Sequence, residues 1–540
     1  MRSAQVDRFV HERLPLISER PEYLWGDASW PHQPHLNVVQ ALFDRVHASG
    51  FADRAFLRSS QRVMTYQEAQ AAVNRLSAYL RQGLNLVPGN RVLLRGSNSI
   101  AMALNWLAVV NAGLIAVSTM PLLRAKELME VIDKAKPSLA LCEDSLFGEL
   151  EMAHASCPLM SSLLSFDRHF TSGEVFSGAA SFESDPQFCP TSPTDIALLA
   201  FTSGTTGKPK VTVHRHLDVM MSCTAWPEHV LKARADDIVM GSPPLAFTFG
   251  LGGLLIFPMY AGSSIFYPDG PYRPESMVEM MKTQGCTVCY TAPTFYRQMA
   301  PLIEKSPVPS LRLCVSAGEA LPLATREGWL KASGLDLIDG IGSTEMFHIF
   351  VSSRPGQLKP GALGLVVPGY EARVVDSEGH ELPRGQVGRL SVRGPTGCQY
   401  MEDTRQARYV QGGWNYPGDL FFQDDEGYFF YQSRDDDMII TSGYNVAAPE
   451  VEDAMLQHPL VAECAVVGQS DLERGMIVKA YCVVKAGVTP SDALKRELQD
   501  HVKSRLAPYK YPREIDFLEH LPRTETGKLQ RFKLKQSPPS

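Results

Sequence analysis

The stretch that decides the fold class runs Phe201-Thr-Ser-Gly-Thr-Thr-Gly-Lys-Pro-Lys210, and it follows an apolar run that predicts a strand over residues 196–201. Its two glycines let the backbone turn tightly and expose N–H groups, while its hydroxyl and lysine side chains add donors and positive charge. Only two residues separate the glycines, and proline follows the first lysine, so the stretch is not a Walker A loop. It therefore predicts a phosphate-binding loop of another nucleotide-binding class. The expected contacts are Thr202, Ser203, Gly204, Thr205, Thr206, Gly207 and Lys208.

Length and composition indicate a globular protein with more than one domain. The 540 residues predict two to four folded units at about 150 residues each. Hydrophobic residues make up 44% and charged residues 21%, which excludes the disordered, collagen-like and disulfide-scaffold classes. A formal net charge of −7 gives no general attraction to nucleic acid or anionic lipid, so neither partner is expected and any anion site must be local.

Several features of the sequence predict a cytoplasmic location without membrane insertion. The first twenty residues carry charges throughout and lack the apolar run of a signal peptide. Asn105 and Asn111 interrupt the longest apolar stretch, residues 101–117, which predicts a buried helix and strand. The ten cysteines form no disulfide framework. Cys286 and Cys289 have the spacing of a metal or redox pair, but we interpret them as part of a buried strand, because no second pair or histidine cluster lies nearby.

Two regions with different patterns divide the chain. From about residue 37 to 433, helical periodicity alternates with short β-rich runs, as in βαβ units. Residues 161–195 lack a period and predict a long connection. After Ser433, one arginine and three aspartates interrupt the apolar pattern, and about 100 residues follow, enough for a small domain. The predicted fold is α/β, with a large N-terminal domain of βαβ layers and mixed sheets at 1–434 and a small α+β domain at 435–540.

Further motifs follow the phosphate loop in a fixed order. They are Ser316-Ala-Gly-Glu319, Gly340-Ile-Gly-Ser-Thr-Glu345, Tyr416-Pro-Gly-Asp419, Arg434 to Gly443, and Pro522-Arg-Thr-Glu-Thr-Gly-Lys528. Together with the loop, they resemble the signature of the adenylate-forming superfamily, which includes acyl-CoA synthetases, peptide-synthetase adenylation domains and luciferases. The resemblance extends from about residue 35 to residue 535.

The resemblance implies a reaction in two halves. A carboxylate attacks the α-phosphate of MgATP to give an acyl-adenylate and pyrophosphate, and the thiol of coenzyme A then displaces AMP. The first half brings two anions together, so cations and N–H donors must be preorganised around them. Lys528 resembles the lysine that bridges the carboxylate and the α-phosphate, Thr344 an α-phosphate donor, and Glu345 a Mg²⁺ ligand. The expected cofactors and co-substrates are therefore ATP, Mg²⁺ and coenzyme A.

The resemblance implies further roles around the nucleotide and at the domain boundary. Asp419 matches a carboxylate that binds both ribose hydroxyls, and Arg434 matches the second ribose contact. Asp436 matches a hinge about which the small domain turns, because one site cannot serve both half-reactions in one arrangement. Gly443 would line the pantetheine tunnel, where a side chain would obstruct the thiol. The other nucleotide contacts implied are Gly318, Glu319, Asp339, Gly340 and Ile341.

Departures from the common pattern indicate one branch of the superfamily. Ile341, Pro417 and Val211 replace a common tyrosine, threonine and glycine. The strings 339–350 and 241–253 look closest to benzoate and 2-aminobenzoate CoA ligases, in which a flat ring would lie between phenylalanine faces and a glycine floor. The implied acid-binding residues are Phe247, Thr248, Phe249, Gly342, His348 and Ile349, of which His348 is either a ligand of the acid or a structural residue.

We therefore expect an AMP-forming ligase that activates 2-aminobenzoate or benzoate and transfers the acyl group to coenzyme A. The alternative is a stand-alone adenylation enzyme that loads an aryl acid onto a carrier protein. A regulatory nucleotide-binding protein without catalysis and a luciferase-type oxygenase are more distant alternatives. A homodimer is expected from the resembling enzymes, whereas the ring substituents and the pathway stay open.

Overall fold

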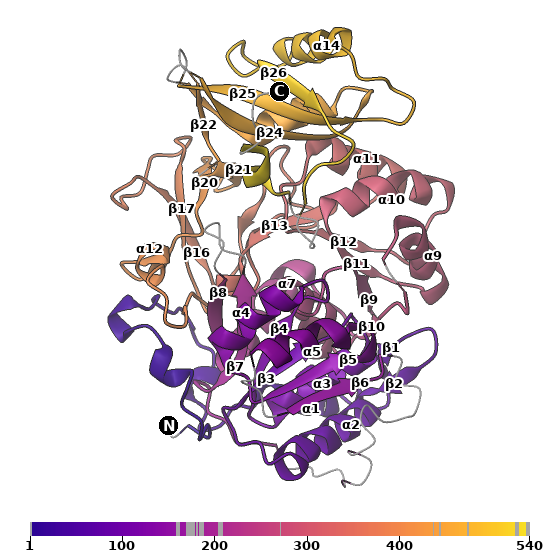
Figure 1. Ribbon diagram of the computed structural model, residues 1–540, viewed down its shortest axis with the longest axis vertical. Helices are drawn as coiled ribbons and strands as arrows, with labels where there is room; N and C mark the ends of the chain where they lie inside the picture. The colour runs from indigo at the N-terminus through magenta and orange to yellow at the C-terminus, as the bar shows by residue number, and fades with distance from the viewer. Residues whose placement is uncertain are drawn as a thin grey trace.

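The computed structural model describes residues 3–157, 162–168, 179, 182, 188–202, 209–270, 272–435, 437–441, 444–471, 475–523 and 529–535. Within these residues the strands form four sheets. In Figure 1 the C-terminal part of the chain, drawn in yellow, lies at one end of the longest axis, next to α10 and α11. The predicted fold class is confirmed, because a large N-terminal part with mixed sheets precedes a small α+β part.

The first sheet carries the phosphate loop. Its strand order is β6-β5-β3-β4-β7-β8, and every neighbouring pair is parallel except β7 with β8. The strands are β3 (Arg91–Arg95), β4 (Ile115–Thr119), β5 (Leu139–Glu143), β6 (Ser162–Phe166), β7 (Ile196–Thr202) and β8 (Lys210–Arg215). Strand β6 corrects the prediction of an unstructured connection over residues 161–195. It forms because it pairs with β5, and sequence period does not signal a pairing.

The second sheet places the carboxyl ends of several parallel strands at one edge. Its order is β15-β14-β13-β12-β11-β9-β10-β1-β2, with parallel pairing from β13 to β1. The strands are β1 (Ala55–Arg58), β2 (Val63–Thr65), β9 (Ile238–Gly241), β10 (Ser264–Phe266), β11 (Val288–Thr291), β12 (Leu313–Ser316), β13 (Leu337–Gly342), β14 (Ile349–Ser352) and β15 (Leu365–Val366). Such an edge is where α/β proteins bind ligands.

The third and fourth sheets lie on either side of the predicted domain boundary. The third contains β16 (Glu371–Val375), β17 (Gly388–Arg393), β18 (Val410–Gln411), β19 (Trp414–Asn415), β20 (Asp419–Gln423) and β21 (Phe429–Arg434). The fourth contains β22 (Ile439–Thr441), β23 (Tyr444–Val446), β24 (Val461–Asp471), β25 (Gly475–Val484) and β26 (Glu514–Phe517). The proposed boundary between residues 434 and 435 thus falls between β21 and β22.

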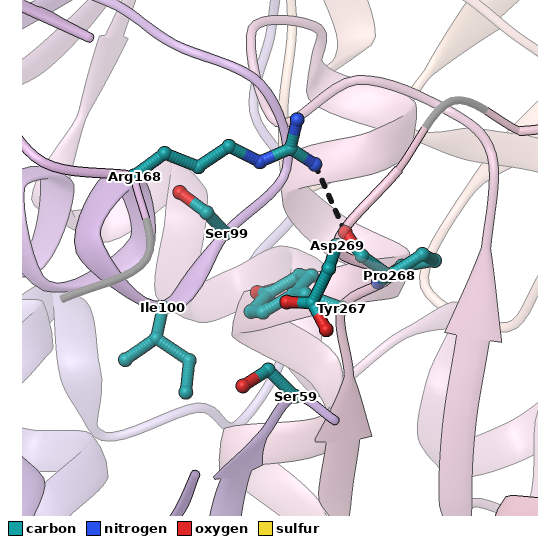
Figure 2. A pocket seen from close by; sticks show the side chains of 7 residues that line it. All are labelled: Ser59, Ser99, Ile100, Arg168, Tyr267, Pro268 and Asp269. Atoms are coloured by element: carbon teal, nitrogen blue, oxygen red, sulfur yellow. Dashed lines mark hydrogen bonds between the residues drawn. The ribbon is translucent and has the colours of Figure 1, made fainter. Parts of the chain in front are cut away.

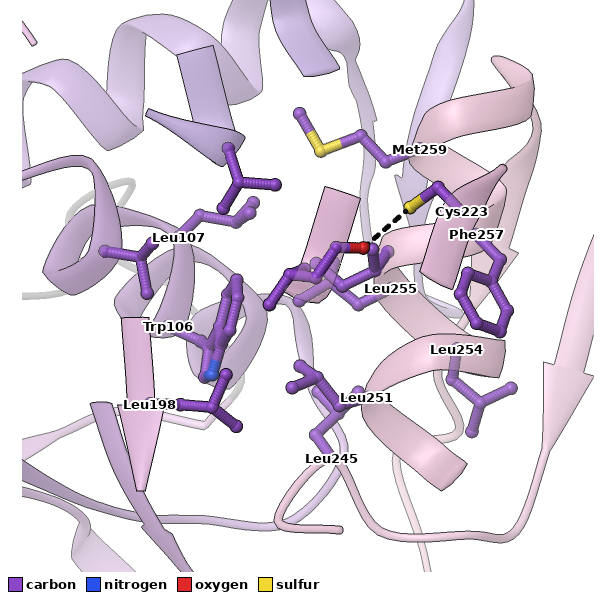
Figure 3. Packing of buried hydrophobic residues seen from close by; sticks show 14 of the residues in the cluster. Trp106, Leu107, Leu198, Cys223, Leu245, Leu251, Leu254, Leu255, Phe257 and Met259 are labelled. Atoms are coloured by element: carbon purple, nitrogen blue, oxygen red, sulfur yellow. Dashed lines mark hydrogen bonds between the residues drawn. The ribbon is translucent and has the colours of Figure 1, made fainter. Parts of the chain in front are cut away.

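Helices cover the sheets and supply much of the core. They are α1 (Val38–Ala48), α2 (Tyr66–Ala78), α3 (Ile100–Asn111), α4 (Ala125–Ala135), α5 (Phe147–Ser156), α6 (His216–Cys223), α7 (Thr248–Leu251), α8 (Phe257–Ala261), α9 (Pro274–Gln284), α10 (Pro293–Lys305), α11 (Leu323–Ser333), α12 (Gln406–Tyr409), α13 (Ala448–Leu456), α14 (Asp492–Lys503) and α15 (Arg531–Lys535). Every residue of α3 is buried, as its uniform apolarity predicts. Figure 3 shows Trp106 of α3 in the main core, together with Leu251, Leu255 and Phe257.

Two further details bear on the sequence predictions. Among the helices of the described residues, none is long and apolar enough to cross a membrane. Thr489 followed by Pro490 predicts a helix start with Thr489 as the N-cap, but α14 begins two residues later. The N-cap is Ser491, whose hydroxyl accepts a hydrogen bond from the Leu494 N–H at 3.2 Å. Serine at this position satisfies a free helix N–H group directly, so it sets the helix start.

Candidate active site

The base of the phosphate loop is closed by the antiparallel pair β7 and β8. Thr202 lies opposite Lys210 in this register, so the loop leaves and returns at the same place. The Lys210 Nζ donates a hydrogen bond to the Tyr400 hydroxyl at 3.3 Å. The residues of the loop that lie outside the described part of the chain are Ser203, Gly204, Thr205, Thr206, Gly207 and Lys208.

Glu345 is held near the base of this loop by Tyr400, which lies between β17 and β18 in the chain. Glu345 lies in the short 3-10 helix η9 (Thr344–Met346), which follows β13. Glu345 itself is 8% exposed. The Tyr400 hydroxyl donates a hydrogen bond to the Glu345 carboxylate. Burial, reinforced by the charge of Glu345, raises the pKa of the Tyr400 hydroxyl far above its usual value, so it stays a proton donor. Lys210, Tyr400 and Glu345 therefore form one hydrogen-bonded chain at the base of the loop.

The neighbours of Glu345 are also fixed. The Ser343 side chain accepts from the Met346 N–H at 3.2 Å and contacts the Tyr409 hydroxyl at 3.0 Å. His214 Nε2 hydrogen-bonds to the Thr344 carbonyl oxygen at 2.8 Å. Burial lowers the pKa of the His214 imidazole, so the ring is neutral and donates from Nε2. The backbone on either side of Glu345, at Thr344 and Met346, is thus held by hydrogen bonds.

The Glu345 carboxylate fits a Mg²⁺ ion that arrives with ATP. Magnesium in nucleotide sites takes one or two carboxylates and completes its shell with phosphate oxygens and water. In the described ranges, no group of three or more His, Cys, Asp or Glu side chains could hold a metal ion. A single buried carboxylate beside a phosphate loop suits a metal bound mainly by its nucleotide.

Asp419 and Arg434 lie side by side at the end of the large domain. They are register partners on β20 and β21, and Arg434 Nη1 lies 3.2 Å from Asp419 Oδ1. Gly418 adopts a φ of +85°, which glycine tolerates and most other residues do not. A Cβ at Gly418 would lie 3.2 Å from Arg434 Nη2, so the turn lets the guanidinium lie close. The two residues expected at the ribose are therefore adjacent.

The other expected nucleotide contacts lie just after β12 and on β13. Gly318 adopts a φ of +94° directly after β12, and Glu319 next to it forms an ion pair with Arg523. Asp339 is buried on β13, and its Oδ1 accepts from the Gly340 N–H at 2.9 Å. Burial raises the pKa of Asp339 to about 7, although Arg326 partly opposes the rise. Ile341 is partly buried on the same strand.

A cluster of aromatic rings surrounds His348, just before β14. Its imidazole centroid lies 4.5 Å from Phe257, 5.2 Å from Trp226 and 5.5 Å from Phe249. Burial lowers the pKa of His348 to about 3, so the ring is neutral at any working pH. Neither ring nitrogen makes a hydrogen bond of ordinary geometry within the described residues, although the Phe249 backbone lies near enough to raise the pKa slightly.

Glycines and a tyrosine complete this ring cluster. A Cβ at Gly252 would meet His348 Cδ2 at 2.8 Å, and one at Gly253 would meet the ring of Tyr290 at 2.7 Å. A Cβ at Gly342 would lie 2.5 Å from the His348 carbonyl oxygen, so β13 approaches β14 only because Gly342 has no side chain. Tyr290 is 1% exposed, and its hydroxyl finds no partner in the described part of the chain.

The structure brings together part of the expected acid-binding set. Phe249, Gly342, His348 and Ile349 meet around β13, β14 and α7. Phe247 and Thr248 precede Phe249 at the start of α7 and make no ring contact with His348. Sequence reasoning missed the ring residues that meet it from other elements, which are Trp226, Phe257 and Tyr290. It also missed Tyr400, since a lone aromatic residue has no motif signal of its own.

Besides the six loop residues, three more expected site residues lie outside the described residues, namely Lys528, Asp436 and Gly443. Cys286 and Cys289 are both fully buried, and burial raises the pKa of each thiol to about 12. Both thiols are therefore protonated. Cys289 lies on the buried strand β11, as expected, whereas Cys286 is buried two residues before that strand.

A small pocket elsewhere in the large domain contains none of the expected site residues. Figure 2 shows its lining, with the Arg168 side chain reaching the Pro268 carbonyl oxygen at 2.9 Å. The lining residues are Ser59, Ser99, Ile100, Arg168, Tyr267, Pro268 and Asp269.

A buried carboxylate, Glu345, near the strand pair that brackets the phosphate-loop motif, followed by a small α+β part, is the arrangement expected of an adenylate-forming enzyme. Comparison with known families agrees: the model of the AMP-binding enzymes matches residues 44–401, and that of the AMP-binding enzyme C-terminal domain matches residues 450–528. The chain belongs to the AMP-binding enzyme family, in the benzoate and 2-aminobenzoate CoA ligase branch of the adenylate-forming superfamily.

One relative found by sequence and two solved structures are similar to this chain over most of its length. The benzoate–CoA ligase of Thauera aromatica is 35% identical over 88% of this chain and 90% of its own length. The crystal structure of the anthranilate CoA ligase AuaEII with anthranoyl-AMP matches with a TM-score of 0.87 and 34% identity, covering 93% of this chain and 97% of that chain. A benzoate CoA ligase from Burkholderia xenovorans matches with a TM-score of 0.83 and 31% identity, covering 93% and 100%.

Proposed function

We propose that this protein is an AMP-forming aromatic acid CoA ligase that activates 2-aminobenzoate or benzoate. The observation that carries the proposal is the ring cluster around His348, next to Gly342 and three residues from Glu345. Aromatic faces and glycine backbone favour a flat, apolar ligand over an acyl chain. The similarity to benzoate and anthranilate CoA ligases supports the same class of acid.

Among aromatic acids, the cluster favours one with a hydrogen-bonding substituent. A neutral imidazole offers one N–H donor and one acceptor nitrogen, and the buried Tyr290 hydroxyl offers one of each. Buried polar groups without partners cost about 1–3 kcal/mol each, so a ligand that pairs with them gains affinity. The amino group of 2-aminobenzoate supplies such a partner, whereas the ring of benzoate does not.

The residues around the nucleotide support the first half-reaction. One oxygen of the acid attacks the α-phosphorus of ATP, the bond to the β-phosphate bridging oxygen breaks, and pyrophosphate leaves. Lys210 and the phosphate loop supply positive charge and donors for the phosphates, and Asp419 and Arg434 hold the ribose. Glu345, aligned by Tyr400, would bind the Mg²⁺ that accompanies ATP. We assign the bridging role between acid and phosphate to Lys528.

The second half-reaction transfers the acyl group to a thiol. The sulfur of coenzyme A attacks the acyl carbon, the bond from that carbon to the phosphate oxygen breaks, and AMP leaves while the thiol loses its proton. We propose that the small domain, residues 435–540, turns about Asp436 between the halves, and that Gly443 leaves room for the pantetheine chain.

A competition assay tests the proposed function. The protein is incubated with MgATP, coenzyme A and equal concentrations of benzoate, 2-aminobenzoate, 2-hydroxybenzoate, a medium-chain fatty acid and phenylalanine. Thioesters and AMP are then measured by mass spectrometry. One dominant aroyl-CoA with matching AMP is the expected result, and a fatty acyl-CoA as the main product would contradict it. Adenylates without any thioester would indicate a carrier protein as the acceptor.

The homodimer and the cytoplasmic location stay predictions from the sequence. Sedimentation of the purified protein tests the first, and fractionation of the source cells tests the second.

A further inference from the structure

An ion-pair cluster joins the small domain to the large domain. Arg523, near the chain's end, lies with Nη1 3.2 Å from Glu319 Oε1 and with Nη2 2.7 Å from Glu463 Oε2. Arg297 of α10 lies 3.7 Å from the other oxygen of Glu463. Glu319 and Arg297 belong to the large domain, whereas Arg523 and Glu463 belong to the small one. Each arginine thus faces an acid across the interface.

A second contact between the two domains involves a residue close to Glu319 in the sequence. The Leu323 N–H, at the start of α11, donates to Asp453 Oδ1 of α13 at 3.1 Å. Glu319 and Leu323 are four residues apart. The segment that follows β12 is therefore bound twice by the small domain, once through an ion pair and once through a backbone hydrogen bond.

Arg523 is also tied to the position of the expected catalytic lysine. Its backbone forms an antiparallel bridge with Leu529, and the Gln530 N–H donates to the Pro522 carbonyl oxygen at 2.8 Å. Lys528 directly precedes Leu529 in the sequence. Arg523 and Leu529, which this bridge pairs with each other, therefore bracket the segment of the sequence that contains Lys528.

We propose that Arg523 is a positioning residue for adenylate formation. Its ion pair with Glu319 anchors the base of the Lys528 segment beside the nucleotide-binding motif after β12. This inference rests on the proposed function, because it assigns the present domain arrangement to the first half-reaction. The paired side chains are 20–24% exposed, and ion pairs of this kind are weak and screened by salt. Such a contact can form and break once in every catalytic cycle.

Separate assays of the two half-reactions test the proposal. The variants are Arg523→Met, Glu319→Gln and their double variant, and the matched control is Lys510→Met. Lys510 pairs with Glu450 at 2.6 Å, within the small domain alone. The first half-reaction is followed by ATP–pyrophosphate exchange at saturating ATP, so that altered nucleotide affinity does not enter. The second is followed by thioester formation from synthetic acyl-adenylate and coenzyme A.

The proposal predicts that the variants lose rate in the assay of the first half-reaction and keep it in the assay of the second. Each single variant should lose about fivefold in exchange rate, as removal of one partly exposed ion pair predicts, and keep the wild-type rate of thioester formation. The double variant should lose no more than Arg523→Met alone, because Arg523→Met already breaks the pair with Glu319. Lys510→Met should retain both rates. Equal losses in both half-reactions, additive losses, or the same split in Lys510→Met would overturn the proposal.

Hydrogen–deuterium exchange provides a readout that does not depend on activity. In Arg523→Met, the peptide that contains Glu319 and Leu323 should exchange faster than in the wild type, while in Lys510→Met it should not. Unchanged exchange in Arg523→Met would refute the anchoring role. If the wild type activates no aromatic acid but this peptide responds, the proposed function fails and the anchoring contact stands.

Discussion

The Tyr400 hydroxyl donates a hydrogen bond to the Glu345 carboxylate and accepts one from Lys210 Nζ at 3.3 Å. Tyr400 lies between β17 and β18, Glu345 lies in η9 after β13, and Lys210 begins β8 at the end of the phosphate-loop motif. One phenol thus links the expected metal ligand to the phosphate-binding motif. The link predicts that Tyr400 orients Glu345.

Replacing Tyr400 with Phe should therefore raise the Mg²⁺ concentration needed for half-maximal exchange and lower the rate of adenylate formation. Loss of one hydrogen bond to a charged group is worth about 1.5–3 kcal/mol, which corresponds to roughly tenfold or more. The measurement is ATP–pyrophosphate exchange as a function of Mg²⁺ concentration. Tyr409→Phe, which removes only the contact with Ser343, is the control. An unchanged Mg²⁺ dependence in Tyr400→Phe would refute the orienting role.

Asp419→Ala should raise the KM for ATP about tenfold and leave the KM for the acid unchanged. The reason is that Asp419 and its register partner Arg434 lie together at the expected ribose site, and loss of a hydrogen-bonded charge costs about 1.5–3 kcal/mol. Steady-state kinetics with each substrate varied in turn measure both constants. If both KM values rise equally, Asp419 acts on the fold and not on the nucleotide.

His348→Phe should reduce kcat/KM for 2-aminobenzoate more than for benzoate, by about tenfold, because only the first acid has a group that pairs with the imidazole. The wild-type pH profile should contain no ionisation of His348 between pH 5 and 9, since burial holds its pKa near 3. Competition between 2-aminobenzoate and benzoate in one reaction mixture measures the ratio of their kcat/KM values. A ratio that the substitution leaves unaltered would assign His348 a structural role.

Lys528→Ala should abolish adenylate formation and leave thioester formation from supplied acyl-adenylate largely intact. The lysine neutralises charge only where two anions meet, which happens in the first half-reaction. Gly443→Leu should do the reverse, because a side chain would obstruct the thiol. Both half-reactions are measured for both variants. Equal losses in Lys528→Ala, or normal turnover in Gly443→Leu, would contradict this division.

The buried Asp453 carboxyl group, which packs against α11, should contribute less to the stability of the protein as pH rises. Burial raises the pKa of Asp453 to about 7, Glu452 and Glu327 add to the rise, and the Leu323 N–H opposes it. A raised pKa means that the folded state binds the proton more tightly, so the contribution to stability falls from about pH 4 to about pH 7. Asp453→Asn keeps the acceptor oxygen without the charge. Its Tm should exceed that of the wild type at pH 8, with the difference shrinking toward pH 4, and an equal difference at both pH values would refute the assignment.

Much of the fold could be predicted because it rests on local patterns. The apolar run of residues 101–117 predicted α3 and β4, and both are buried. The change of pattern after Ser433 lies where the third sheet ends and the fourth begins. Strand β6 and the start of α14 were missed, because one depends on its pairing with β5 and the other on a competition between neighbouring caps.

The sequence by itself determined the family and the identity of the motif residues, since both depend on residue types at short, fixed spacings. Only the tertiary structure decided which residues complete each motif. Tyr400 reaches Glu345 across 55 positions, and Arg523 reaches Glu319 across 204. Trp226, just before the short helix Pro227–Leu231, meets His348, just before β14. Contacts across such separations arise from the packing of sheets and helices, and a single sequence carries no periodic or local signal for them.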